Sequence, residues 1–189
     1  DAIHAVYQAG VQELGENTAQ SLCAHAEALA LRGCFPQWHF IGRLQRNKVK
    51  LVLRYASCIH TLDRVELAQS LQDHAGEKKV RVFVQVNIGR EPQKGGVAPE
   101  DAISFARSLT KYPALQLQGL MAIPPATEAS KQPYFMAMQA LSHALCSYPE
   151  VSHANELSMG MSDDFVEAIR WGATCVRIGT ALFGAREVP

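Results

Sequence analysis

The chain has 189 residues, and its 18 basic and 18 acidic side chains cancel to a formal net charge of zero. This balance excludes the strong one-signed field by which basic proteins attract nucleic acid or anionic membranes, so we expect a small-molecule partner. The length suits one well-buried domain, and we predict a single, monomeric domain over residues 1–189.

Helical and extended patterns alternate from the start of the chain. A helical pattern runs to Gly10, and a short strand is predicted over 12–17. A helix rich in Ala and Leu is predicted over 18–32, and a strand over 37–42. The alternation favours an α/β fold.

The middle of the chain repeats the pattern, with helices predicted over 45–55 and 64–74 and strands over 57–62 and 80–88. In the last of these strands one face is uniformly aliphatic, and it is formed by Val80, Val82, Val84, Val86 and Ile88. The opposite face becomes polar toward its carboxyl end. This is typical of a strand that packs on helices with one side and faces a site with the other.

Three more helices and three more strands complete the series. The helices are predicted over 99–111, 131–147 and 163–171, and the strands over 115–123, 156–160 and 175–184. Seven βα units of roughly 25–30 residues predict a (β/α)8 TIM barrel that lacks one strand, because such barrels usually need about 250 residues. A doubly wound open sheet is the alternative, but its usual G-x-G-x-x-G turn is absent from the sequence.

The cysteines predict a reducing, cytoplasmic environment. They are odd in number and scattered, with no C-x-x-C pair and no histidine at metal-ligand spacing, so we predict reduced thiols and no metal site. No apolar run reaches the length of about 18 residues that a membrane span needs, and no signal or transit peptide opens the chain.

One arginine interrupts the apolar stretch "CVRIGTALFG". Arg177 cannot shed its charge, so it needs either a buried acidic partner or a ligand. Gly179 and Thr180 follow it, and Ser158 lies on the preceding predicted strand. In a barrel these strand ends are adjacent, and their hydroxyl and amide groups suit a phosphate. The sequence therefore predicts a ligand with a phosphate at one end and a polar ring further in.

Other strand ends are consistent with this site, although each also has a purely structural interpretation. Asn17 ends the first strand as a turn residue would, and Met121 is typical of core packing. His39 and Ile41 share a face that we expect to line the barrel. A separate group, Ser162 to Asp164, is interpreted as the cap of the helix that follows.

Five segments closely resemble the pyridoxal phosphate homeostasis protein family, single-domain relatives of the alanine racemase barrel. They are "ELGEN", "WHFIG.LQ.NK", "GLMAI", "LSMGMSDD..EAI..G" and "VRIGTALFGAR", in that order and at the family's distances. The resemblance covers essentially the whole chain. It implies a barrel of PLP fold type III, the alanine racemase type, that binds pyridoxal 5'-phosphate (PLP).

The resemblance also implies roles for individual residues. Arg177 would face the pyridine nitrogen, and the fixed cation would keep that nitrogen unprotonated. Such a ring is a poor electron sink, which suits a carrier. The phosphate would be held by Ser158, Gly179 and Thr180, and the pocket would be lined by Asn17, His39, Ile41 and Met121.

The family's Schiff-base lysine has no counterpart in this sequence. It belongs to a first barrel strand that would precede Asp1, so we expect an N-terminal extension of roughly 35–50 residues in the natural product. The nearest alternative amine is Lys94, which we expect to be a flexible, solvated loop residue.

The expected function is non-catalytic: PLP binding or delivery in vitamin B6 homeostasis and linked amino-acid homeostasis, with PLP-dependent apoenzymes as partners and no catalytic residues. Two alternatives remain, a PLP-dependent racemase-like enzyme and a barrel for another phosphorylated metabolite. Racemases of this type take a second base from an additional β domain, which weighs against the first alternative.

Overall fold

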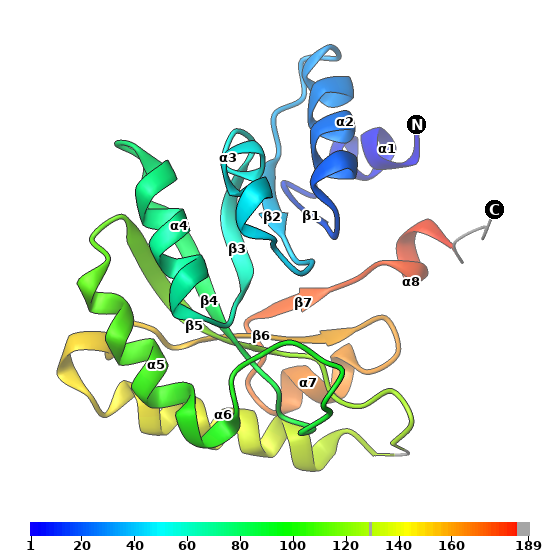
Figure 1. The fold of residues 1–189 in the computed structure, drawn as a ribbon. Coiled ribbons are helices and arrows are strands. Elements are labelled where there is room, and N and C mark those ends of the chain that lie inside the picture. The colour runs from blue at the N-terminus through cyan, green and yellow to red at the C-terminus, as the bar shows by residue number, and fades with distance from the viewer. Residues whose placement is uncertain (129, 185–189) are drawn as a thin grey trace.

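Seven parallel strands form one curved sheet with helices on its outer side (Figure 1). The computed structural model describes residues 1–128 and 130–184; the last residues of the "VRIGTALFGAR" motif and of the predicted domain lie outside this part. Among the described residues the strands are β1 Glu13–Glu16, β2 Gln37–Phe40, β3 Ala56–Leu62, β4 Val80–Val86, β5 Leu115–Ala122, β6 Glu156–Met161 and β7 Cys175–Arg177.

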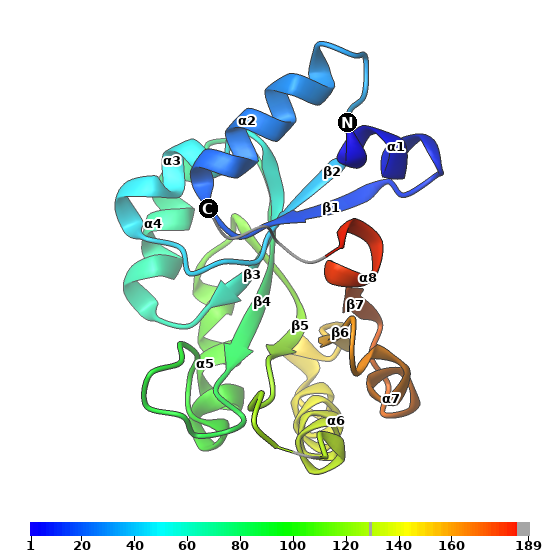
Figure 2. The ribbon, with the colours of Figure 1, turned by 90° about the vertical axis from the view of Figure 1, so that its right-hand side faces the viewer.

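The strands pair in chain order from β1 to β7, and every pair is parallel. This order confirms the predicted barrel and excludes the doubly wound sheet, in which the strand order reverses. In the described chain β1 and β7 are the two edges of the sheet. Figure 2 shows them on either side of the open part of the barrel.

The helices follow the predicted alternation, but several are shorter than expected. They are α1 Ala2–Gln8, α2 Ala19–Ala30, α3 Val49–Val52, α4 Val65–Ala75, α5 Ala102–Ser108, α6 Gln132–Cys146, α7 Phe165–Arg170 and α8 Thr180–Phe183. The predicted helices 45–55 and 99–111 contain 3₁₀ turns at 46–48, 99–101 and 109–111. Among the described helices, none combines the length and the apolar character that crossing a membrane demands.

The sheet separates two apolar regions. The larger core lies between the sheet and the helices, and it contains the valines of β4 together with Leu67 and Leu71 of α4. A small cluster inside the barrel consists of Cys58, Phe83 and Met121. The alternation in β4 therefore places its valines outward and Phe83 inward, as the sequence predicts.

The predicted strand 175–184 is wrong beyond Arg177. The chain leaves the sheet after β7, and residues Thr180–Phe183 form the short helix α8. The cause lies in the backbone amides of Gly179 and Ala181, which donate to the Ser162 hydroxyl at 3.2 Å instead of extending the ladder. The apolar "ALF" segment is exposed at Leu182 and Phe183 rather than buried in a strand.

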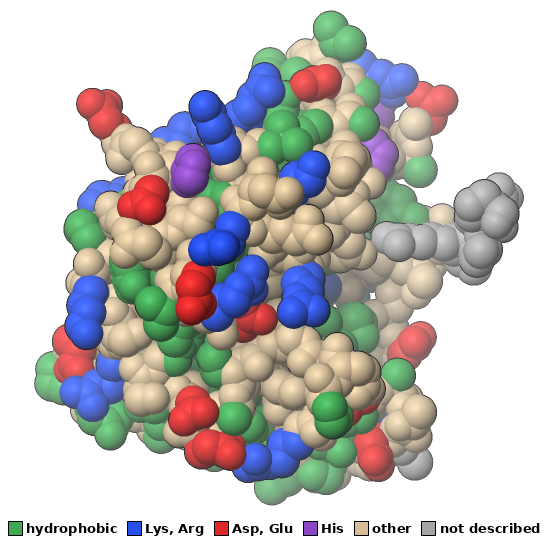
Figure 3. Space-filling view, in the orientation of Figure 1, with side chains coloured by type: hydrophobic (Ala, Val, Ile, Leu, Met, Phe, Trp, Pro, Cys, Tyr) green, Lys and Arg blue, Asp and Glu red, His purple; other side chains and the backbone are tan. Residues whose placement is uncertain are grey.

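Charged side chains of both signs are interspersed on the molecular face seen in Figure 3. Exposed ion pairs in the described part of the molecule include Arg107 with Glu150 at 2.7 Å and Arg90 with Glu100 at 3.0 Å. Exposed pairs of this kind contribute little to stability. The candidate functional site therefore lies inside the barrel rather than among these ion pairs.

Candidate functional site

Arg177 lies at the end of β7 and points to neutral acceptors. Its Nη1 donates to Ser158 Oγ at 2.7 Å, and its Nη2 donates to the Ala122 carbonyl oxygen at 3.0 Å. Among the described residues no ion pair includes Arg177. Burial lowers its pKa, but a guanidinium remains charged at neutral pH. The charge is thus held in place without being neutralised by an acid.

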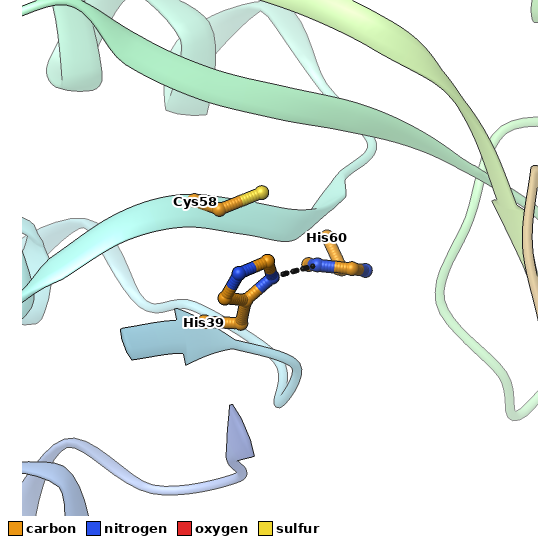
Figure 4. A group of neighbouring side chains, drawn as sticks. All are labelled: His39, Cys58 and His60. Carbon is orange, nitrogen blue, oxygen red and sulfur yellow. Dashed lines mark hydrogen bonds between the residues drawn. The ribbon is translucent and has the colours of Figure 1, made fainter. Parts of the chain in front are cut away.

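Ser158 continues from Arg177 into a buried chain of hydrogen bonds. Its Oγ lies 2.8 Å from His60 Nδ1, and His60 Nε2 lies 2.8 Å from His39 Nδ1. Ser158 is fully buried, and the two histidines are 1% and 8% exposed. These residues come from β6, β3 and β2, so the chain crosses the interior of the barrel. Figure 4 shows the contact between the two imidazole rings.

Both histidines are kept neutral by their surroundings. Burial, followed by the neighbouring His39, Arg177 and Arg81, lowers the pKa of His60 to about 2. Burial also lowers the pKa of His39, with Arg81 acting in the same direction and Glu13 opposing it. Each neutral imidazole has one donor and one acceptor nitrogen.

The depressed pKa of His60 predicts a loss of stability in mild acid. In the unfolded chain His60 takes up a proton near pH 6.5, whereas the folded state resists protonation down to about pH 2. Stability from this group is therefore full above pH 6.5 and is lost progressively as the pH falls toward 2. From His60 alone we expect the free energy of unfolding to drop by about 1 kcal/mol between about pH 7 and about pH 5.5.

Urea unfolding at the two pH values measures this drop. The variant His60→Asn should reduce the dependence, and His153→Asn, which changes an exposed histidine, should retain it. Equal pH dependence in the wild type and His60→Asn would contradict the assignment.

His39, Cys58 and His60 also form a group whose ligand atoms lie within 4.8 Å of one another (Figure 4). The register of β2 and β3 pairs His39 with Cys58, a proximity that sequence spacing did not reveal. Two observations argue against a metal ion here. The facing imidazole nitrogens already bond to each other, and Arg81 Nη2 lies 3.5 Å from His39 Nε2. Burial raises the pKa of the Cys58 thiol to about 12, so without a metal it stays protonated.

Gly179 is the N-cap of α8 and Thr180 is its first residue, so both lie where the chain turns from β7 into α8. Ser162 Oγ accepts hydrogen bonds from the amides of Gly179 and Ala181, so this hydroxyl joins the loop after β6 to the turn after β7. The interpretation of Ser162 as a helix cap is therefore wrong. The N-cap of α7 is Asp164, whose carboxylate instead accepts from the Met161 amide at 2.6 Å. Sequence reasoning missed this contact between Ser162 and the segment predicted to hold a phosphate.

The remaining predicted residues fall into two places. Met121 is buried inside the barrel and lies opposite Ser158 in the register of β5 and β6. Asn17 and Ile41 follow the neighbouring strands β1 and β2, and Asn17 is exposed. The Ile41 amide donates to the backbone carbonyl oxygen of Glu16 at 2.9 Å. The structure thus brings Arg177, Ser158, Met121 and His39 together, while Asn17 and Ile41 form a separate pair. Their roles toward a ligand remain predictions.

Lys94 is not the flexible loop residue expected from the sequence. Its ammonium group bonds to the Pro124 carbonyl oxygen at 3.2 Å and pairs with the Glu91 carboxylate at 2.6 Å. These contacts tie the loop after β4 to the end of β5. A reaction of the Lys94 amine with a ligand would have to break both contacts.

A polar cavity of about 210 Å³ lies at the opposite, amino-terminal end of the strands. Glu13, Arg81 and Glu156 line it, and His39 and Cys175 also reach its wall. Burial raises the pKa of Glu156, and the nearby Arg81 counteracts this. The series of hydrogen bonds that starts at Arg177 therefore ends at His39, beside this cavity at the amino-terminal end of the strands.

Comparisons with known proteins define the family. The family described as "Alanine racemase, N-terminal domain" matches residues 1–187. Proteins named "Pyridoxal phosphate homeostasis protein" are 40% identical in Haemophilus influenzae, over 98% of this chain and 80% of the relative, and 39% identical in Escherichia coli, over 98% and 81%. The chain belongs to the pyridoxal phosphate homeostasis protein family. Its relatives are named for homeostasis and not for a reaction.

Solved structures agree with this membership. PipY of Synechococcus elongatus, in a structure without PLP, is 34% identical with a TM-score of 0.89, covering 97% of this chain and 86% of PipY. The structure of PipY with PLP bound is 32% identical in sequence to this chain and has a TM-score of 0.87. An alanine racemase of Clostridium difficile is 17% identical with a TM-score of 0.71, covering 97% of this chain but 47% of the racemase, and this likeness concerns the fold.

Proposed function

We propose that this family member binds PLP and acts as a non-catalytic carrier in vitamin B6 homeostasis. The observation that carries the proposal is Arg177, a partly buried guanidinium held by two neutral oxygens and without an acidic partner among the described residues. Leaving a buried charge unpaired is costly unless a ligand meets it. A pyridine nitrogen with a free lone pair is an acceptor for such a donor.

The residues present fit the two ends of PLP. Arg177 would take the ring nitrogen and disfavour its protonation, because a second positive charge nearby is repelled. Gly179 and Thr180 offer backbone amide and hydroxyl donors for the phosphate, and Ser162 holds their turn in place. Ser158 is predicted to hold the phosphate as well, but in this structure its buried hydroxyl bonds to Arg177 and His60, so that role would require it to give up one of these bonds. Asn17, His39, Ile41 and Met121 would line the pocket. When bound, PLP supplies an electron sink, which an unprotonated ring weakens.

Several finer points belong to the same proposal. The chain is 40% and 39% identical to relatives named for homeostasis, whereas it is 17% identical to the racemase. This favours a carrier over a racemase-like enzyme. We also propose a cytosolic, monomeric protein that delivers PLP to apoenzymes, in keeping with five cysteines that are free in the described chain.

A titration of the protein with PLP tests the proposal. We expect saturable one-to-one binding, seen as a change in PLP absorbance, and weaker binding of pyridoxal, which lacks the phosphate. Inorganic phosphate should compete only weakly, because it offers nothing to Arg177. Binding of pyridoxal as tight as that of PLP, or no saturable binding, would contradict the proposal.

Two further measurements separate the alternatives. PLP-loaded protein should leave the optical activity of alanine unchanged, whereas a racemase would abolish it. After borohydride treatment, peptide mapping should find no PLP adduct on Lys94, because Glu91 holds its ammonium group. Tighter binding of another phosphorylated metabolite than of PLP would favour the second alternative, a barrel that binds that metabolite.

A further inference from the structure

The Ser158 hydroxyl stands between a cation and an imidazole, and this position determines how its hydrogen is used. Arg177 has donors only, so Ser158 Oγ must accept from Nη1 at 2.7 Å. Among the described residues, this oxygen also forms a hydrogen bond with His60 Nδ1, at 2.8 Å. Because Ser158 is fully buried, a hydroxyl hydrogen that is not given to His60 would find only the sulfur of Cys175, which is a weak acceptor.

Donation from Ser158 to His60 fixes the direction of every hydrogen bond in the series from Arg177 to His39. If Ser158 donates to His60 Nδ1, the hydrogen of neutral His60 is on Nε2, from which it reaches His39 Nδ1 at 2.8 Å. The hydrogen of His39 is then on its Nε2, which lies 3.8 Å from a Glu13 carboxylate oxygen. Donation thus runs from Arg177 through Ser158 and His60 to His39.

The opposite direction would begin at Arg81, which lies 3.5 Å from His39 Nε2. That contact is at the limit of a hydrogen bond, and Arg81 has a better acceptor in Gln37 Oε1 at 2.9 Å. If donation ran from His39 toward Ser158, it would gain the weak Arg81–His39 contact at the partly exposed end. The buried Ser158 hydrogen would then lose His60 Nδ1 as its acceptor. Burial therefore favours donation away from Arg177.

His60 is held firmly enough to serve as the fixed point. Its ring stacks on Phe83 with a centroid distance of 4.5 Å and an interplanar angle of 24°. His39 engages its second nitrogen, and the side chain is 1% exposed. A ring locked on its face and at both nitrogens cannot turn away from Ser158.

The geometry points to His60 as a positioning residue for the cofactor-facing arginine. By accepting the Ser158 hydrogen, His60 orients the Ser158 lone pair that holds Arg177 Nη1, and the guanidinium is thereby kept in line with the pocket. His60 touches neither the ring nor the phosphate in this arrangement. The inference rests on the proposed PLP binding for its functional effect, but the direction of the chain is a property of the free protein.

Two substitutions distinguish this role from simple core packing. In His60→Asn the amide oxygen occupies the place of Nδ1 and still accepts from Ser158, whereas in His60→Gln the amide lies at the place of Nε2 and loses Ser158. We expect PLP affinity within about twofold of wild type for His60→Asn and about fivefold to tenfold weaker for His60→Gln, as for one lost hydrogen bond. The ¹⁵N shift of the ring nitrogen in labelled PLP should change in His60→Gln alone. Equal affinity and equal shift in both variants would overturn the role.

The free protein supplies a second test that needs no variant. With ¹⁵N-labelled histidine, we expect NMR to find both His60 and His39 protonated at Nε2. Protonation of His60 at Nδ1 would overturn the inference even if PLP binds. If the wild type does not bind PLP, the proposed function fails, while this measurement still decides the direction of the chain.

Discussion

Arg177→Gln is expected to weaken PLP binding by about tenfold to a hundredfold. A hydrogen bond to a charged group contributes about 1.5–3 kcal/mol, which corresponds to that range of affinity. Glutamine retains a polar head but has neither the charge nor the forked donor set that reaches Ser158 and Ala122 together. Isothermal titration with PLP measures the change, and the ¹⁵N shift of labelled PLP should move toward the protonated ring.

The matched control is Arg170→Gln, which removes the same charge from an exposed position on α7. It should leave PLP affinity within about twofold of wild type, because exposed charges at a distance are screened. Arg177→Lys should fall between the two, since it keeps the charge but offers a single donor centre. If Arg170→Gln and Arg177→Gln lose the same affinity, the effect is one of net charge and Arg177 does not face the ring.

The strands could be predicted from the sequence because period-two patterns are local. The aliphatic face of residues 80–88 required only the alternation of side chains along a strand, and the structure places those valines in the outer core. Arg177 attracted attention for an equally local reason, an obligatory charge in an apolar run. In both cases a few consecutive residues contained the whole signal.

His60 and Ser162 could not be found in this way. His60 meets Ser158 across 98 residues of sequence, and only the curvature of the sheet brings β3 opposite β6. Ser162 was taken for a local cap because serine before a helix usually is one. Its partners are amides 17 and 19 residues further on, in a turn that exists because the chain leaves the sheet after Arg177. Long-range contacts of buried polar groups carry no periodic signal.

The charges at the two ends of the hydrogen-bonded series explain how the histidines between them affect the site. Arg81 and Arg177 place a cation near each end of the chain, and the two histidines between them stay neutral. A proton added to either ring would meet positive charge nearby, so the interior resists gaining charge. Within residues 1–128 and 130–184, Arg177 is then the fixed positive charge that would face the proposed ring position, which is the condition for an unprotonated pyridine nitrogen.

Gly42→Ala is expected to cause the largest loss of stability, about 3 kcal/mol, or roughly 6–12 °C in melting temperature. A β-carbon at Gly42 would lie 1.7 Å from the Asn17 carbonyl oxygen and 2.5 Å from the Asn17 carbonyl carbon. Both are backbone atoms, so no side-chain rotation relieves the clash. The Gly42 carbonyl also accepts from Thr61 Oγ1 at 2.6 Å, which links the ends of β2 and β3 and restricts movement of Gly42.

Gly33→Ala is the appropriate comparison, because it separates lack of space from backbone strain. Gly33 has a φ of +71° but no atom within 4 Å of an added β-carbon, so its replacement should cost only about 1 kcal/mol of left-handed strain. Gly42→Ala should also displace Asn17 and Ile41 and weaken PLP binding, whereas Gly33→Ala, between α2 and β2, should not. Thermal unfolding of the two variants side by side decides the matter. Equal melting temperatures would mean that the end of β1 moves freely away from β2, and a rigid pocket wall at these strand ends would be ruled out.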